Sequence, residues 1–422
     1  MAYRLSRIVC RFTFAALLVA LVFGSPARSY SAFRTLRAHS AFLQSSIVVD
    51  SSSVSHTFGE QMVFTLAAHA DSDIISAALL IRVGDDAHTE VVEVVVTPAP
   101  RLEAEVRRDL QTRPIPPFTP VVYFWRLADA GGEILSTPEQ AYLYDDNRFE
   151  WQTIRRGAVA AHWYGGDLPF GQSIADTGYE SLDRVSRFIN ASPPDLVNVY
   201  VYANVSDLQS GLRLGGRTWV GGHADPALGV VLVAASPDAN GLLSLQHDLP
   251  HELTHVMVYQ AVGAGYDRMP VWLDEGLAVN AELEPNADFA IALADAAKKA
   301  GAIHESPLLS LESLCASFGV DPAQALLSYA ESASVVRYVL DRWGPDGVGD
   351  LLAAYRDGAT CEGGVQRALN VTLAQLQADW QNDVLDASPV YKFLRDLTPA
   401  LLVFCPTAII IALLIFVPKR KK

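Results

Sequence analysis

The feature that most constrains the fold of this chain is the run His251-Glu252-Leu253-Thr254-His255. On a helix, residues four positions apart lie on the same face, so both imidazoles can reach one metal ion. Glu252 follows the first histidine and can act as the base for a metal-bound water. The run therefore predicts a helix, placed at residues 246–260, that carries two ligands of a metal site.

A hydrolytic zinc ion needs a third protein ligand and an open fourth position. Glu275 follows His255 by twenty residues, in the run Pro270-Val271-Trp272-Leu273-Asp274-Glu275-Gly276. Pro270 suits the start of a second helix, which we place at residues 270–282. Two helices joined by the loop 261–269 can converge on one ion. We therefore predict one zinc ion, bound by His251, His255 and Glu275.

With these two motifs, residues 150–390 resemble the gluzincin zinc metallopeptidases, the clan of thermolysin and the membrane-alanyl-type aminopeptidases. The resemblance implies an α+β peptidase domain (residues 151–390) with an all-α C-terminal lobe, and a peptide or protein substrate. The tryptophan-leucine-x-glutamate-glycine context of Glu275 resembles the aminopeptidase branch, whereas its spacing from His255 matches thermolysin. The aminopeptidase signature for the substrate amine is absent from residues 217–235. Endopeptidase and aminopeptidase action therefore both stay open.

The same resemblance assigns roles to Tyr329 and Glu282, and helix position indicates those of Asp274 and His247. Tyr329, 54 residues after the metal glutamate, matches a tyrosine that hydrogen-bonds the developing oxyanion; a buried core tyrosine is the alternative. Glu282 resembles a second glutamate of the aminopeptidase branch, and we expect it to be the partner of a ligand histidine. Asp274 is expected to orient neighbours and not to bind zinc. We interpret His247, one turn before His251, as helix packing, with a role beside the ligands or the substrate as the alternative.

Residues 30–150 have a β pattern. Runs rich in Val, Ile, Leu and aromatic residues lie at 61–68, 75–83, 90–97 and 121–127. Turn signals such as Pro98-Ala99-Pro100 separate them. Short strands at this spacing, without helices between them, favour an antiparallel β-sandwich of immunoglobulin or fibronectin type. The domain holds no cluster of titratable residues that suggests a site, and we expect it to support the peptidase domain.

Both ends of the chain predict export and anchoring. Residues 1–29 have the pattern of a secretory signal peptide, and an uncleaved anchor is the alternative. Residues 397–417 carry no charge and can cross a hydrocarbon core of about 30 Å. The basic tail Lys419-Arg420-Lys421-Lys422 then predicts a cytoplasmic C-terminus. Residues 391–422 are thus expected to form a single transmembrane anchor, with the peptidase domain outside the cytoplasm.

Charge and cysteine usage limit the partners and the compartment. The net charge is −15, and residues 30–418 alone carry 24 basic against 47 acidic groups. Phosphate backbones would repel so acidic a body, so no nucleic-acid binding is expected. Cys10 and Cys405 fall in the apolar ends. Cys315 and Cys361 either form a disulfide in an oxidising compartment or stay separate buried thiols.

The sequence therefore predicts a membrane-anchored, extracytoplasmic zinc peptidase. Glu252 would accept a proton from the attacking water and pass it to the leaving amine, and Tyr329 would help to hold the oxyanion; the zinc ion, when bound, would supply a water of lowered pKa. The alternative is a catalytically silent surface module whose peptidase-like domain binds partners. The intact set of Glu252 and the three ligands argues against this module, because a decayed site usually loses one of them.

Overall fold

The computed structural model describes residues 46–385, apart from residues 86, 216–221, 285, 301–307 and 320. The predicted signal peptide (1–29) and the predicted membrane span (397–417) lie outside the described residues. Among the helices that are described, none combines the length and the apolar character needed to cross a bilayer.

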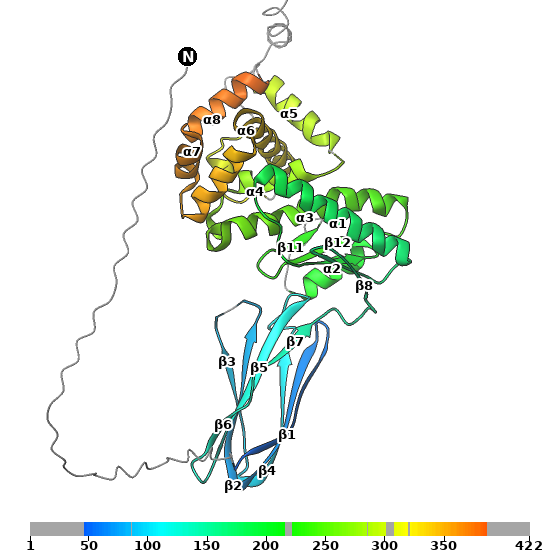
Figure 1. The fold of residues 1–422 in the computed structure, drawn as a ribbon, viewed down its shortest axis with the longest axis vertical. Helices are drawn as coiled ribbons and strands as arrows, with labels where there is room; N and C mark the ends of the chain where they lie inside the picture. Colours follow the sequence, from blue (N-terminus) through cyan, green and yellow to red (C-terminus); the bar gives the residue numbers. More distant parts are fainter. Residues whose placement is uncertain are drawn as a thin grey trace, which may run out of the picture. The chain divides into compact units, whose positions relative to one another are not determined.

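The first part of the described chain is an antiparallel sheet of seven strands (Figure 1). The strands are β1 (Val48–Thr57), β2 (Gln61–Val83), β3 (Glu90–Val94), β4 (Ala99–Asp109), β5 (Thr119–Asp129), β6 (Ile134–Ser136) and β7 (Gln140–Tyr144). The first half of β2 pairs with β1 and β4, and its second half pairs with β3 and β5.

The prediction of an antiparallel β-domain is confirmed, but its arrangement as a sandwich needs correction. The strands form one hydrogen-bonded sheet, whereas an immunoglobulin sandwich has two. The physical reason is that the two strands predicted at 61–68 and 75–83 are a single strand. β2 continues through the polar residues between them with a register shift, and so joins both parts of the sheet.

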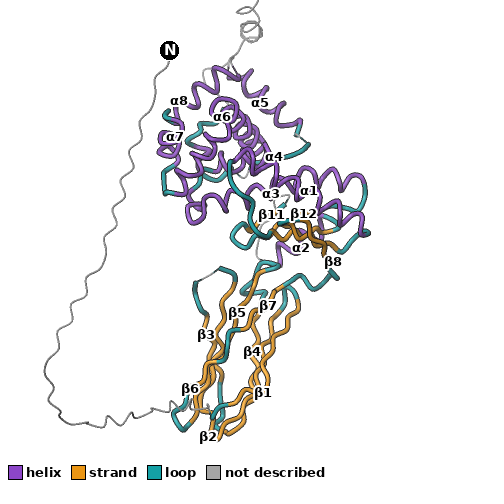
Figure 2. The backbone as a smooth tube through the Cα atoms, viewed as in Figure 1, coloured by secondary structure: helices purple, strands orange, loops and turns teal. Residues whose placement is uncertain are grey.

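The second part is a five-stranded sheet with helices, and Figure 2 shows the change from strands to mixed structure. Its strands are β8 (Gln152–Arg156), β9 (Val159–Trp163), β10 (Val197–Tyr202), β11 (His223–Asp225) and β12 (Val230–Ala234), in the order β11-β12-β10-β9-β8. β9, β10 and β12 are parallel and mostly buried, as expected for strands covered on both faces.

Alternate side chains of β10 enter different cores. Val197, Val199 and Val201 pack with the helices α1 (Leu168–Ile189) and α3 (Ala239–Val262). Tyr200 and Tyr202 pack on the opposite face with α2 (Val205–Leu214). Such alternation is expected of a central strand, because successive side chains point to opposite faces of the sheet. Packing against the valines of β10 places α3, the helix of the histidine motif, on one face.

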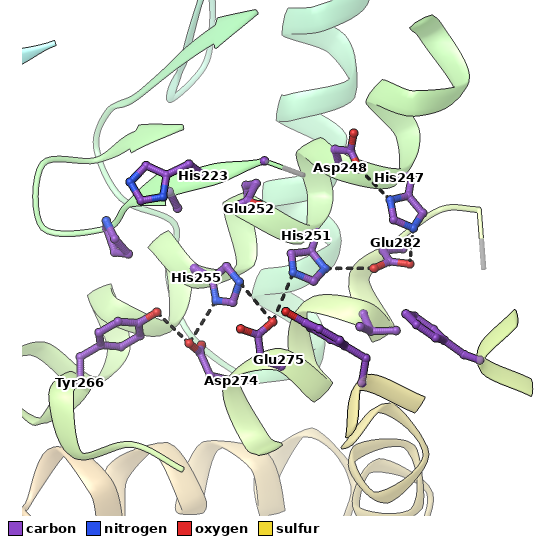
Figure 3. A pocket seen from close by; sticks show the side chains of 16 residues that line it. His223, His247, Asp248, His251, Glu252, His255, Tyr266, Asp274, Glu275 and Glu282 are labelled. Atoms are coloured by element: carbon purple, nitrogen blue, oxygen red, sulfur yellow. Dashed lines mark hydrogen bonds and ion pairs between the residues drawn. The ribbon is translucent and has the colours of Figure 1, made fainter. Parts of the chain in front are cut away.

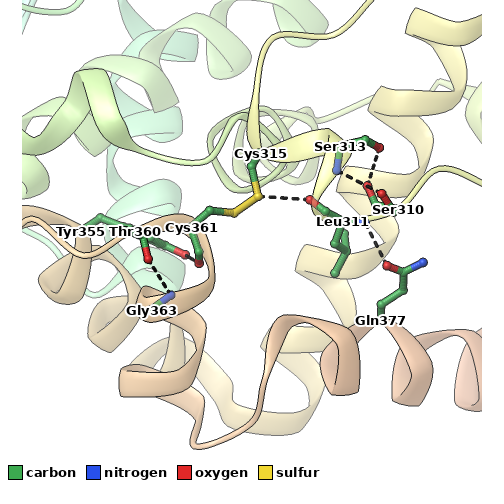
Figure 4. The surroundings of a disulfide bond; sticks show 9 residues. All are labelled: Ser310, Leu311, Ser313, Cys315, Tyr355, Thr360, Cys361, Gly363 and Gln377. Carbon is green, nitrogen blue, oxygen red and sulfur yellow. Dashed lines mark hydrogen bonds between the residues drawn. A yellow bond between two sulfur atoms is a disulfide. The ribbon is translucent and has the colours of Figure 1, made fainter.

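The third part is helical, which confirms the predicted all-α lobe. It contains η1 (Gly263–Arg268), α4 (Val271–Ala281), α5 (Ala287–Ala300), η2 (Ser313–Cys315), α6 (Pro322–Arg356), α7 (Cys361–Leu369), α8 (Leu373–Trp380) and η3 (Gln381–Leu385). Helix α6 has a kink at Gly344, which has a φ of 69° and precedes Pro345. A disulfide joins Cys315 in η2 to Cys361 at the start of α7 (Figure 4), which is the first of the two alternatives left by the sequence.

Candidate metal centre

Helix α3 carries both histidines of the motif. His251 and His255 are one turn apart, while Leu253, Val256 and Met257 on its other side are buried in the core. The helix starts earlier than predicted, because the carboxylate of Asp238 accepts hydrogen bonds from the backbone N–H groups at its first turn. The packing of α3 therefore presents one face, with both imidazoles, to the pocket.

A proline inside α3 links this helix to the end of α4. Pro250 has no N–H, so the carbonyl of Gln246 loses its usual partner in the helix. That carbonyl accepts a hydrogen bond of 3.1 Å from the backbone N–H of Leu283 instead. This bond holds Glu282, the residue before Leu283, beside the part of α3 where the histidine motif begins.

Helix α4 brings the third residue of the cluster. Glu275 lies on α4, and Gly276 follows it. A Cβ at Gly276 would lie 2.5 Å from the carbonyl oxygen of Ser332 on α6, so only glycine allows this approach of α4 to α6. Oε2 of Glu275 lies 3.4 Å from Nε2 of His251 and 3.8 Å from Nε2 of His255.

These three residues fit a metal ion. One ligand atom from each of His251, His255 and Glu275 lies within 4.8 Å of the others. Two imidazoles and a carboxylate are typical zinc ligands, and bond lengths of about 2.0–2.1 Å place tetrahedral ligand atoms about 3.3 Å apart. Oε2 of Glu275 is also buried and makes no hydrogen bond to a described residue. The predicted residues thus lie together and form a group that could hold a metal.

The support of His251 comes from Glu282, at the C-terminal end of α4 (Figure 3). Nδ1 of His251 lies 2.9 Å from Oε1 of Glu282, and since a carboxylate only accepts, this nitrogen is the donor. Its Nε2 is left for the cluster. Oε2 of Glu282 lies 3.1 Å from Nε2 of His247, an ion-pair distance at an angle outside that of a hydrogen bond. His247 therefore lies beside the ligands, in contrast to its interpretation as helix packing.

The support of His255 comes from Asp274, the neighbour of Glu275. Oδ2 of Asp274 lies 3.1 Å from Nδ1 of His255, again at ion-pair distance without hydrogen-bond geometry. The same oxygen accepts a hydrogen bond of 2.8 Å from the hydroxyl of Tyr266 in η1. Sequence reasoning missed Tyr266, because a tyrosine in a loop has no period or motif that marks it.

Glu252 lies in a confined position beside the cluster. Its side chain is buried, with 9% of the residue exposed, and burial raises its pKa against the lowering effect of His251 and His255. A Cβ at Gly222, just before β11, would lie 2.5 Å from Oε1 of Glu252. The absence of a side chain at Gly222 therefore makes the room that this carboxylate occupies.

Tyr329 lies on α6 and lines the same pocket. Its ring centre is 6.5 Å from that of His251, and Phe318 and Phe289 pack against it at 5.1 and 6.2 Å. Burial raises its pKa. Its hydroxyl makes no hydrogen bond to another described residue, in contrast to the hydroxyl of Tyr266. The phenol is thus neutral and has a proton to donate.

The electrostatics of the pocket favour a positive charge at the cluster. Burial lowers the pKa of His255, but the charge and contact of Asp274 raise it to about 9. Burial also lowers the pKa of His251, but Glu275 and Glu282 raise it well above its ordinary value. The carboxylates around the two imidazoles therefore stabilise a cation between them, whether a proton or a metal ion.

The pocket has a volume of about 560 Å³ and is bordered by β11. Gly222, His223 and Ala224 line one side, and Val279, Phe289 and Tyr329 supply apolar surface. The described residues that line the pocket include histidines and carboxylates but no Lys or Arg. The arrangement can hold a metal ion, a base and a phenol donor next to β11, the last strand of the sheet among the described residues.

Residues 177–386 match the Peptidase MA superfamily. No curated protein matches the chain. Among solved structures, an M1 zinc metallopeptidase mutant from Deinococcus radiodurans is 14% identical, with 79% of this chain and 94% of that chain covered and a TM-score of 0.35. An aminopeptidase N family protein from Idiomarina loihiensis is 10% identical, with 81% and 74% covered and a TM-score of 0.33. Catalytically inactive OgpA from Akkermansia muciniphila is 8% identical; 23% of this chain is covered but only 28% of OgpA, with a TM-score of 0.19.

Proposed function

Residues 177–386 belong to the Peptidase MA superfamily, and from this premise we propose that the chain is a zinc peptidase that hydrolyses peptide bonds of peptides or proteins. One observation carries the proposal: His251, His255 and Glu275 converge within 4.8 Å in a pocket that Glu252 also lines. A binding module without catalysis has no need for a buried carboxylate beside such a cluster.

The chain's own residues would each have a separate task. His251, His255 and Glu275 would hold the zinc ion, which supplies a Lewis acid for the scissile carbonyl and lowers the pKa of water. Glu252, whose pKa burial raises, would accept a proton from the attacking water and pass it to the leaving amine. Tyr329 would donate its hydroxyl proton to the carbonyl oxygen as negative charge develops there.

The substrate would bind along β11. This strand pairs with β12 on one side, and no described strand pairs with its other edge. An extended peptide can add to such an edge through main-chain hydrogen bonds, while pockets take its side chains. Gly222 and Ala224 would then bring the scissile bond next to Glu252.

We further propose that the domain acts outside the cytoplasm, tethered by residues 397–417. The disulfide between Cys315 and Cys361 supports this location, because such bonds persist in oxidising compartments and are rare in the cytosol. The uncharged run and the basic tail of the sequence support the tether. Cysteine accessibility on either side of the membrane would test it.

The function is tested by the zinc content and the cleavage of a mixed peptide library, with the full chain compared to Glu252→Gln. We expect about one zinc in both proteins, because Glu252 is not in the ligand cluster. Cleavage should fall by at least about a thousandfold in Glu252→Gln, as expected for loss of a general base in a hydrolytic site.

The outcomes separate the alternatives. One zinc in both proteins without cleavage in either would favour the catalytically silent module. No zinc in either would mean that the cluster is only a part of the core. The cleaved positions of the library would also decide between endopeptidase and aminopeptidase action.

A further inference from the structure

We propose that His247 is a positioning residue: it bridges Asp248 and Glu282, and it thereby fixes the orientation of His251. The inference rests on the proposed function, since it assigns His247 a role in the same metal centre. It concerns a residue that holds neither the metal nor the substrate.

The contacts form a continuous line along one side of the cluster (Figure 3). Nδ1 of His247 lies 2.8 Å from Oδ1 of Asp248, and its Nε2 lies 3.1 Å from Oε2 of Glu282. The other oxygen of Glu282 accepts the Nδ1 proton of His251 at 2.9 Å. Glu282 is therefore held by a histidine on each of its two oxygens.

The surroundings of His247 favour two protons on its ring. Both ring nitrogens lie at ion-pair distance from carboxylate oxygens, and the negative charge of these groups stabilises the cationic form. The pKa of His247 agrees: the contact with Asp248 and then that with Glu282 raise it to about 9, against the lowering effect of burial. At neutral pH the ring is an imidazolium, which offsets the cost of a buried carboxylate at Glu282.

Without His247, Glu282 would lose its only described partner on Oε2. The residue is 4% exposed, so water could not replace this partner freely. Its carboxylate could then rotate, and the Nδ1 contact that sets the ring of His251 would be lost with it. Loss of such an orienting partner typically weakens a metal site by about 10–100-fold.

Two substitutions separate the contacts of His247. Asparagine keeps a donor near the position of Nδ1, toward Asp248, whereas glutamine keeps a donor near the position of Nε2, toward Glu282. We expect the zinc Kd of the full chain, measured by chelator competition, to rise about 10–100-fold in His247→Asn and to stay within about threefold in His247→Gln. The Co²⁺-substituted protein should show an altered d–d spectrum in His247→Asn only.

A matched control is His162→Asn. His162 also lies in the peptidase domain and contacts Thr153 and Asn198, but it does not line the pocket. It should leave the zinc Kd unchanged. The side chain of His247 is about one third exposed, with 36% accessible, so both variants at this position are expected to fold.

The results have distinct meanings. Equal zinc affinity in wild type, His247→Asn and His247→Gln would overturn the positioning role and leave the peptidase proposal in place. An equal loss in both variants would also overturn it, since the effect would then come from the charge that both variants lack and not from a donor directed at Glu282. A wild-type chain that binds no zinc would overturn the proposed function itself.

Discussion

The two histidines of the cluster are supported by carboxylates that are used in different ways. On the His251 side, Glu282 uses both oxygens, one for His251 and one for His247. On the His255 side, Asp274 uses one oxygen, Oδ2, for both His255 and Tyr266. Its Oδ1 is buried and forms no hydrogen bond to a described residue.

Because of this difference, we expect Glu282 and Asp274 to tolerate replacement of the carboxylate by an amide to different degrees. An amide has one accepting oxygen and one donating nitrogen, whereas a carboxylate accepts on both. A glutamine at position 282 could therefore satisfy one histidine and would present N–H groups to the other. An asparagine at position 274 could keep both contacts on its single oxygen.

Among substitutions at Tyr329, Glu282 and Asp274, the largest effect is expected from Tyr329→Phe. This variant leaves both supporting carboxylates intact and so separates zinc binding from turnover. Loss of one oxyanion donor typically lowers kcat by about a hundredfold or more. The zinc Kd should stay at the wild-type value, because Tyr329 lies outside the ligand cluster. Steady-state kinetics beside chelator competition would check both numbers. Wild-type turnover would show that Tyr329 is a packing residue.

The next largest effect is expected from Glu282→Gln. The variant loses one of the two contacts of this side chain, and the zinc Kd should rise by about 10–100-fold. Chelator competition at fixed pH measures it, with kcat at saturating zinc as the control for turnover. A zinc Kd equal to that of wild type would remove the basis for the difference between the two carboxylates.

The smallest effect is expected from Asp274→Asn. Its amide oxygen can take the place of Oδ2 and accept from both Tyr266 and His255, so the zinc Kd should rise by less than about tenfold. The same titration, run beside Glu282→Gln, decides the comparison. If Asp274→Asn is the weaker binder of the two, the charge of the carboxylate matters more than the number of its accepting oxygens.

The cluster itself was predictable because its geometry is local. His251 and His255 share a face of any helix that contains them, and Glu275 comes from a second short helix close by in sequence. The family resemblance then pointed to Glu282, and the place of Asp274 beside Glu275 on the helix indicated its orienting role. The contacts of His247 and Tyr266 were not predictable, because each depends on how η1, α3 and α4 pack together.

The N-terminal sheet shows a different limit of sequence reasoning. Pro98-Ala99-Pro100 indicated a turn, yet β4 begins at Ala99. Ala99 pairs with Ile74 and Arg101 with His69, so Pro100 lies at the register shift of β2, where its missing N–H breaks no regular pair. The period of two in each strand was visible in the sequence, whereas the length and path of β2 depend on partners far along the chain.

Pro250 has a further consequence for how this centre can change during evolution. The bond from Leu283 to Gln246 consists of backbone atoms alone, so most side chains at these two positions would leave it intact. Substitutions at Gln246 or Leu283 should therefore have little effect on the position of Glu282. That position depends instead on Pro250, whose missing N–H leaves the carbonyl of Gln246 available to Leu283. The sensitive residue is thus Pro250, which takes no part in the chemistry.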